Sequence, residues 1–245
     1  MGIKNPDPIL QPLIRLKQNI YAIMPSLWRF SAAERNLTVL LNRLPSERAI
    51  YSCLVSEKET LMRQNIMSCL STMALRYVHN TVEGLPDIDL GLIDDSEKAC
   101  LLLELKWFIE PAEVREAIEK SQEIEKGIYQ LIQLRKAFSK NNRALLEKLK
   151  IDTSYELLGV VVSANSIGHA EVQSTDVPVI RKDHLVAKLE NTLSLKAVID
   201  WLKKRKYLPI EGEHYEVHRI TTKVGNYGLE FYEIKPLINE AFFPL

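Results

Sequence analysis

Two short apolar runs within residues 85–107 constrain the fold of this chain more than any other stretch. Residues 87–93 and 98–109 each have the length and composition of a β-strand, and the polar segment DDSEK between them predicts a hairpin turn. The second run, which contains CLLLELKWFI, is almost entirely apolar except for Glu104 and Lys106. Because burying an unpaired charge costs several kcal/mol of hydration, these two residues indicate a role beyond packing.

The charged residues of the two runs are expected to gather on one side of the sheet. Side chains alternate between the faces of a strand, so Asp87 and Asp89 share one face of the first strand, and Glu104 and Lys106 share one face of the second. If the strands pair as a hairpin, all four can project toward the same edge. A plain ion pair at the end of a strand, Glu104 with Lys106 or Asp89 with Lys106, would explain them without any chemistry.

Helices are expected before this hairpin. The first predicted helix, over 11–24, ends before Pro25, because the residue before a proline disfavours the helical conformation. A long amphipathic helix is predicted over 56–77, where apolar residues recur at steps of three and four. Ser56 and Glu59 have the spacing of a capping box at its start.

Helices and strands alternate after the hairpin. The expected elements are a long helix over 112–138, a shorter helix ending at Leu149, strands over 155–163 and 177–180, helices beginning at Asp183 and Ser194, and a final hairpin with Gly225 and Asn226 in its turn. This order predicts a mixed α/β fold with one long helix packed against a central sheet.

Charge composition gives no general attraction to nucleic acids or anionic membranes, because 32 basic and 32 acidic residues leave the net charge at zero. Contact with a nucleic acid would need a local patch, since phosphate binding dominates such affinity. The densest cluster of cations is the KKRK segment, which consists of Lys203, Lys204, Arg205 and Lys206. The same four residues also suit the C-terminal end of a helix, where cations interact well with the helix dipole.

Other site and compartment signals are weak. The three cysteines form no CxxC pair, so neither a disulfide framework nor a zinc ribbon is indicated. His214 and His218 have the spacing of a helical metal pair, but their segment alternates like a strand. No secretory signal opens the chain and no apolar stretch approaches the ~20 residues of a membrane span. We therefore expect a cytoplasmic protein without a membrane partner.

The features of this region follow a definite order: an acid, a strand, a turn, an apolar strand, Glu-x-Lys and a long helix. This order resembles that of the PD-(D/E)xK phosphodiesterase superfamily, which includes restriction endonucleases, Holliday-junction resolvases and many repair and defence nucleases. Pro86 and Asp87 supply the literal PD, ahead of the Glu104–Leu105–Lys106 motif. The resemblance covers roughly residues 56–237. It implies a restriction-endonuclease-like α/β fold, in which helices flank a central mixed sheet in the order αβββαβ. We expect a helical N-terminal extension over 1–55 and a nuclease-like domain over 56–245.

The resemblance also implies roles for the charged residues. Asp89 and Glu104 would bind Mg²⁺ or Mn²⁺, with the carbonyl oxygen of Leu105 as a third ligand, because hydrolysis of a phosphodiester benefits from a divalent cation that neutralises the phosphate and activates water. Lys106 would orient the attacking water and stabilise negative charge in the transition state. Asp87 is the alternative first ligand and ranks below Asp89.

Relatives often carry two further polar residues. One lies on the helix after Glu-x-Lys, where Gln130 is the candidate by position, although a helical wheel places Gln122 and Glu125 closer to the apolar edge. The other is a glutamate on the helix before the first strand. Glu57 and Glu59 are candidates, but helix capping explains Glu59 without any catalysis.

These features together predict a metal-dependent endonuclease that hydrolyses phosphodiester bonds, with DNA as the expected substrate. Two alternatives remain open. The chain could be a catalytically silent binding or scaffold module of a larger assembly, or an RNA-directed nuclease with the same site. A homodimer or a larger defence or repair assembly is compatible with either kind of nuclease.

Overall fold

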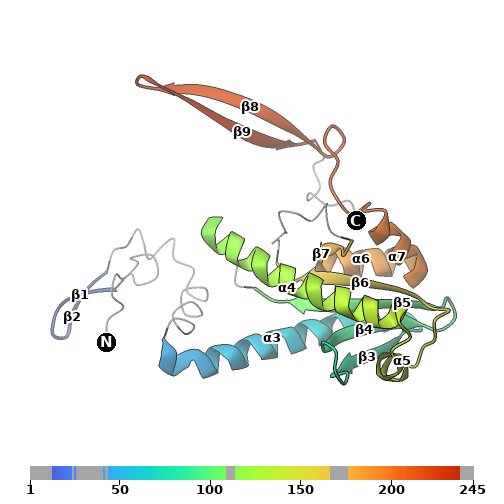
Figure 1. Ribbon diagram of the computed structural model, residues 1–245. Coiled ribbons are helices and arrows are strands. Elements are labelled where there is room, and N and C mark those ends of the chain that lie inside the picture. Colours follow the sequence, from blue (N-terminus) through green and yellow to red (C-terminus); the bar gives the residue numbers. More distant parts are fainter. Residues whose placement is uncertain are drawn as a thin grey trace.

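A five-stranded mixed sheet forms the centre of the computed structural model, which describes residues 13–23, 25, 41, 44–108, 114–165 and 176–237 (Figure 1). Its strands, in spatial order, are β3 (Arg76–Asn80), β4 (Ile88–Asp94), β5 (Ala99–Lys106), β6 (Glu156–Ser163) and β7 (Val179–Arg181). The first three strands pair antiparallel, whereas β5, β6 and β7 run parallel. The predicted α/β class and the central hairpin are therefore confirmed.

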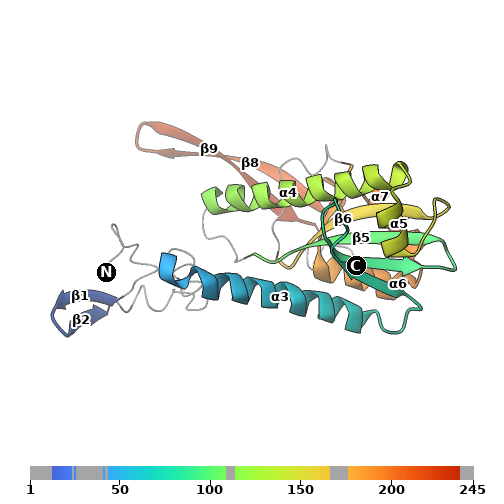
Figure 2. The ribbon, with the colours of Figure 1, turned by 60° about the horizontal axis from the view of Figure 1, so that its bottom comes forward.

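Helices pack against both faces of the sheet (Figure 2). One face carries α3 (Arg48–Cys69), α6 (Lys182–Thr192) and α7 (Leu195–Lys203), and the other carries α4 (Val114–Ser139) and α5 (Arg143–Leu149). A short 3-10 turn, η1 (Pro45–Glu47), precedes α3. Among the described residues, no helix combines the length and apolar character that a membrane crossing requires.

Strand β5 is apolar on both sides because it lies between these two layers. Leu101, Leu103 and Leu105 belong to the core under α3, α6 and α7, whereas Cys100 and Leu102 belong to the core under α4 and α5. A strand covered on both faces is expected to be almost continuously hydrophobic. Because side chains alternate between the two faces, Glu104 and Lys106 at the end of β5 lie on the same side of the sheet as α4.

The helix predicted over 11–24 is wrong. Residues Leu13–Lys17 (β1) and Ile20–Ile23 (β2) form an antiparallel hairpin. Asn19 takes the left-handed conformation in its turn, with a φ of 63°, which asparagine tolerates better than most residues. Cross-strand pairing thus overrides the helical pattern, and the N-terminal extension is not purely helical. Most of the remaining extension lies outside the described residues.

The long helix before the central hairpin begins and ends earlier than predicted. Helix α3 starts at Arg48, so Ser56 and Glu59 lie in its interior and form no capping box. It ends at Cys69. Residues 70–75 of the predicted helix form a turn and a loop, and residues 76 and 77 belong to strand β3, which pairs with β4. The boundary placed between residues 55 and 56 therefore falls inside one continuous helix.

The elements after β5 agree with the prediction apart from their ends. Ser194 caps α7 and accepts a hydrogen bond from the N–H of Ala197 at 3.1 Å, as expected for an N-cap. Helix α6 begins one residue earlier than Asp183 and has no side-chain cap. The chain then forms a hairpin of β8 (Tyr215–Val224) and β9 (Tyr227–Pro236), in which Gly225 has a φ of 61°.

The terminal hairpin stands apart from the sheet, and every residue of β9 is exposed (Figure 1). We expect Phe231→Ala in β9 to change the free energy of unfolding by less than about 1 kcal/mol, as exposed substitutions usually do. Ile66→Ala, at a fully buried position of α3, should cost about 3 kcal/mol. Urea unfolding followed by circular dichroism measures both. A loss of similar size in Phe231→Ala would mean that the hairpin packs against the domain.

Candidate active site

The register of the central hairpin places Asp89 opposite Glu104. The last pair of β4 with β5 is Leu90 with Leu103, and the next position outward on each strand is Asp89 and Glu104. At this point the side chain of Asp89 links the strands, because its Oδ2 accepts a hydrogen bond from the N–H of Leu105 at 2.8 Å. The main chain of β5 therefore fixes the carboxylate of Asp89 beside that of Glu104.

Glu104 and Lys106 form a buried ion pair on the same face of β5. Lys106 Nζ donates to Glu104 Oε1 at 2.7 Å, and only 3% of the surface of Glu104 is exposed. The Glu104–Lys106 ion pair, which would explain both charges without any chemistry, is therefore present. It does not exclude a catalytic role, because Asp89 lies beside it and its charge acts on both partners.

Burial is the largest single influence on the pKa values of the site residues. Burial, followed by repulsion from Asp89, raises the pKa of Glu104 to about 7, although Lys106 opposes the shift. Burial also raises the pKa of Asp89, against the opposing effects of the Leu105 hydrogen bond and the Lys106 charge. Burial disfavours the charged form of Lys106, but the carboxylates around it outweigh burial and raise its pKa. Lys106 therefore stays protonated at neutral pH.

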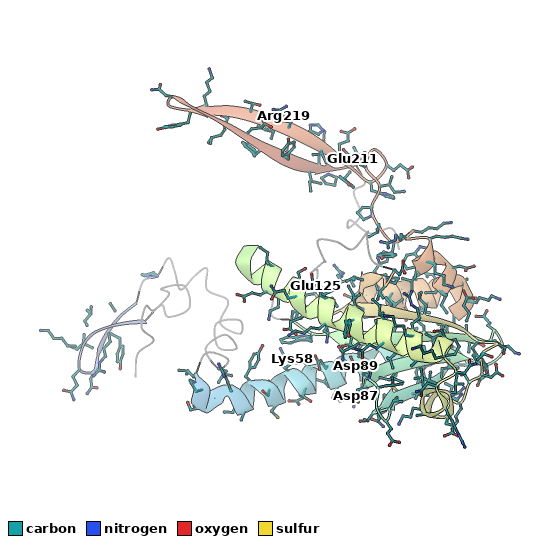
Figure 3. All side chains as sticks on the ribbon, viewed as in Figure 1. Lys58, Asp87, Asp89, Glu125, Glu211 and Arg219 are labelled. Atoms are coloured by element: carbon teal, nitrogen blue, oxygen red, sulfur yellow. The ribbon has the colours of Figure 1, made fainter. Side chains whose placement is uncertain are left out.

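Helix α3 passes the ends of β4 and β5 and contacts both strands. Lys58 Nζ lies 3.9 Å from the centroid of the Trp107 ring, directly after the Glu-x-Lys motif. Five residues further along the helix, Arg63 reaches the main-chain carbonyl oxygen of Asp89 at 3.5 Å. Figure 3 labels Lys58 on α3, and Asp87 and Asp89 where β4 begins. The helix is therefore held against the segment after β5 and against the start of β4.

Glu59 lies between these two contacts and joins the charged cluster. It is half-buried, and burial followed by the negative charge of Asp89 raises its pKa, with Lys106 opposing the shift. Capping had explained Glu59 from the sequence, but the early start of α3 removes that explanation. The other candidate on this helix, Glu57, is exposed.

Helix α4 approaches the ion pair closely at Gly127. A Cβ atom at this position would lie 2.8 Å from Cγ of Glu104 and 3.2 Å from Cε of Lys106. The absence of a side chain therefore lets α4 cover the pair and exclude water from it. Sequence reasoning missed this residue, although a glycine in the middle of a long helix is a signal of close packing.

The other predicted site residues are less closely associated with the pair. Asp87 is exposed just before β4, and its charge contributes to the raised pKa of Asp89. Gln130 is half-buried on α4, whereas Gln122 and Glu125 are exposed. Within the described part of the chain, Gln130 makes no hydrogen bond to Glu104.

The cationic segment and the histidines lie elsewhere. Lys203 forms an ion pair with Glu156, on a helix that packs against the opposite face of the sheet from Glu104. His214 Nδ1 accepts a hydrogen bond from the N–H of Ile210 at 2.8 Å, and His218 pairs with a neighbouring glutamate in β8. The two histidines are thus engaged separately.

The donor set of the site fits a hard divalent cation. Among the described residues, no group of three or more His, Cys, Asp or Glu side chains could hold a metal by itself. Mg²⁺ does not need one, because it keeps several waters and is often bound through one or two carboxylates. Asp89 and Glu104 supply two carboxylates whose mutual repulsion a cation would relieve. The carbonyl oxygen of Leu105 stays a predicted third ligand.

Comparisons with protein-family models, curated proteins and solved structures found no match for this chain. The functional conclusion therefore rests on the residues and charges of the site itself.

Gly127→Ala should disturb the site through steric overlap with Glu104. We expect the free energy of unfolding to fall by about 1 to 3 kcal/mol, even though alanine favours a helix over glycine by about 1 kcal/mol. Urea unfolding measures the change. Gly228→Ala in the terminal hairpin is the control, since a Cβ there meets nothing within 4 Å. A gain in stability for Gly127→Ala would contradict the close approach of α4.

Ionisation of Glu104 should destabilise the folded protein when no metal is present. Its folded-state pKa of about 7 lies above the ordinary value of 4.5, so the stability contributed by this group is lost as pH rises toward 7. In EDTA at pH 8, Glu104→Gln should therefore be more stable than the native chain by on the order of 2 kcal/mol. The difference should shrink toward zero near pH 4.

Urea unfolding at several pH values tests this expectation. Glu119→Gln, at an exposed position of α4, is the matched control and should show little pH dependence of the difference. A Glu104→Gln difference that stays constant from pH 4 to 8 would mean that burial does not govern the titration of Glu104.

Proposed function

We propose that this chain is a metal-dependent nuclease of the PD-(D/E)xK type that hydrolyses phosphodiester bonds in DNA. The observation that carries the proposal is the convergence of Asp89, Glu104 and Lys106 at the open end of the central hairpin. The order α3, β3, β4, β5, α4, β6 also supports it, because the resemblance implies the order αβββαβ. DNA is proposed as the substrate because restriction endonucleases and junction resolvases act on it.

The carboxylates define where a cation and a phosphate would bind. When bound, a divalent cation would neutralise the phosphate and make the attacking water more acidic. Asp89 and Glu104 would hold the cation, and the Leu105 N–H already fixes one oxygen of Asp89. Glu59 adds a third negative charge close by.

Lys106 would act on the substrate rather than on the cation. Its ammonium group is held 2.7 Å from Glu104, and it remains protonated because the surrounding carboxylates raise its pKa. A fixed ammonium group in a site shielded from water stabilises the negative charge that develops on the phosphate oxygens. Glycine at position 127 keeps α4 close enough to provide that shielding.

The decisive experiment compares Lys106→Ala with the native chain in a cleavage assay. Plasmid, linear and single-stranded DNA and RNA are incubated with Mg²⁺, with Mn²⁺ or with EDTA. We expect cleavage that needs the divalent ion, and a fall in rate of at least about 100-fold in Lys106→Ala, because an aligned charged donor is lost. Lys98→Ala, at an exposed position before the other end of β5, should cleave at the native rate.

Three outcomes would revise the proposal. Equal cleavage by Lys106→Ala would refute the role of this residue. Cleavage of RNA alone would correct the substrate. If no nucleic acid is cut and calorimetry detects no binding of Mg²⁺ or Mn²⁺, the scaffold alternative replaces the nuclease.

A further inference from the structure

A cavity of about 300 Å³ lies between α6 and α7. Lys188 lines it from α6, and Asp200, Trp201 and Lys204 line it from α7, with Lys206 just beyond that helix. The buried side of α7 packs in the same core as Leu101 and Leu103 of β5. The cavity therefore lies on the opposite side of the sheet from Glu104, and it has the size of small ligand sites.

The cavity carries an excess of positive charge. Three ammonium groups face one carboxylate, that of Asp200. Lys203 is neutralised by Glu156, but within the described residues neither Lys204 nor Lys206 takes part in an ion pair. The structure thus divides the KKRK segment into one paired lysine and two lysines available to an anion.

The end of α7 holds these two lysines beside the cavity. Arg205 takes the left-handed conformation with a φ of 53°, and the N–H of Lys206 bonds back to the carbonyl oxygen of Trp201 at 3.2 Å. This bond is the 6→1 contact of a Schellman motif. It turns the chain back over the last turn of the helix, so that Lys206 returns to the cavity that Lys204 lines.

Trp201 forms a fixed apolar wall. His184 meets its ring edge-on at a centroid distance of 5.2 Å, and Tyr207 packs against it at 5.7 Å. The ammonium group of Lys188 lies 5.4 Å from the centroid of the ring. An indole ring beside several ammonium groups suits a ligand that combines a phosphate with a planar or apolar group.

We propose that the cavity between α6 and α7 binds a phosphate group through Lys188, Lys204 and Lys206, with Trp201 contacting the group attached to the phosphate. A free nucleotide and a nucleic-acid strand both carry this chemistry. The proposal does not depend on the nuclease activity, because the cavity and the Asp89–Glu104 site lie on different faces of the sheet.

Calorimetric titration of the full chain in EDTA tests the proposal. The probes are inorganic phosphate, adenosine monophosphate and a single-stranded DNA of about 12 nucleotides, which is within the usual site size for such strands. We expect at least one probe to bind saturably and more weakly as salt rises. The double variant Lys204→Gln/Lys206→Gln should bind it about tenfold or more weakly, because two phosphate contacts are lost.

Lys203→Gln is the matched control, since it removes a neighbouring charge outside the cavity and should change the affinity by less than about twofold. Asp200→Asn should strengthen binding, because it removes the one carboxylate among the described residues of the lining. Circular dichroism of each variant checks that the fold is retained, as expected for exposed side chains.

The probes distinguish the two sources of phosphate. Binding of the mononucleotide without the DNA supports a free nucleotide, and tighter binding of the DNA than of the mononucleotide supports a strand. The proposal is overturned if no probe binds saturably, or if Lys204→Gln/Lys206→Gln binds as tightly as the native chain. Either failure leaves the nuclease proposal intact, because cleavage and the effect of Lys106→Ala are measured separately.

Discussion

The buried ion pair between Glu104 and Lys106 is the interaction on which the arrangement of the site depends. Strand β5 is covered on both faces, so its charged end must be satisfied locally. A buried pair rarely stabilises a fold more than apolar residues of similar volume would, because both charges lose their hydration. Burial of the pair beside Asp89 is therefore poorly explained by stability alone, and this is why a chemical role is proposed for these three residues.

Strand alternation and a plausible turn were sufficient to predict the centre of this site from the sequence. They placed Asp89, Glu104 and Lys106 on one face of a hairpin, and the observed register agrees. The position of Glu59 in the site could not be predicted by strand alternation, because this residue lies on helix α3. Its spacing from Ser56 satisfies a local capping rule, and only the tertiary extent of α3 shows that the rule does not apply. Local patterns thus identified β4, β5 and β6 but not β1, β2 or β3, and the helix ends depended on contacts distant in sequence.

The same limit explains the error at β3 and the equivalence of the four KKRK cations in the sequence. Apolar residues continue at helical spacing past the end of α3, so nothing local distinguishes the last predicted turn from a strand that pairs with β4. Four adjacent cations likewise look equivalent in a sequence. Glu156, far away along the chain, pairs with Lys203 and leaves Lys204 and Lys206 beside the cavity. In both cases a partner remote in sequence decides the outcome.

The charge balance of the site argues for a cation more strongly than the number of ligands does. The charge of Asp89 raises the pKa of both Glu59 and Glu104, and Glu59 also raises that of Glu104, although burial is the larger cause in each case. Lys106 and Arg63 supply the positive charges that oppose the raised pKa of Asp89. The Leu105 N–H and the packing of α4 at Gly127 prevent the carboxylates from separating. Because the fold holds the carboxylates together, their repulsion lowers the stability of the folded protein. A divalent cation would relieve this repulsion. This strain is the physical reason for the proposed cation, because charges fixed before a ligand binds are what electrostatic preorganisation requires.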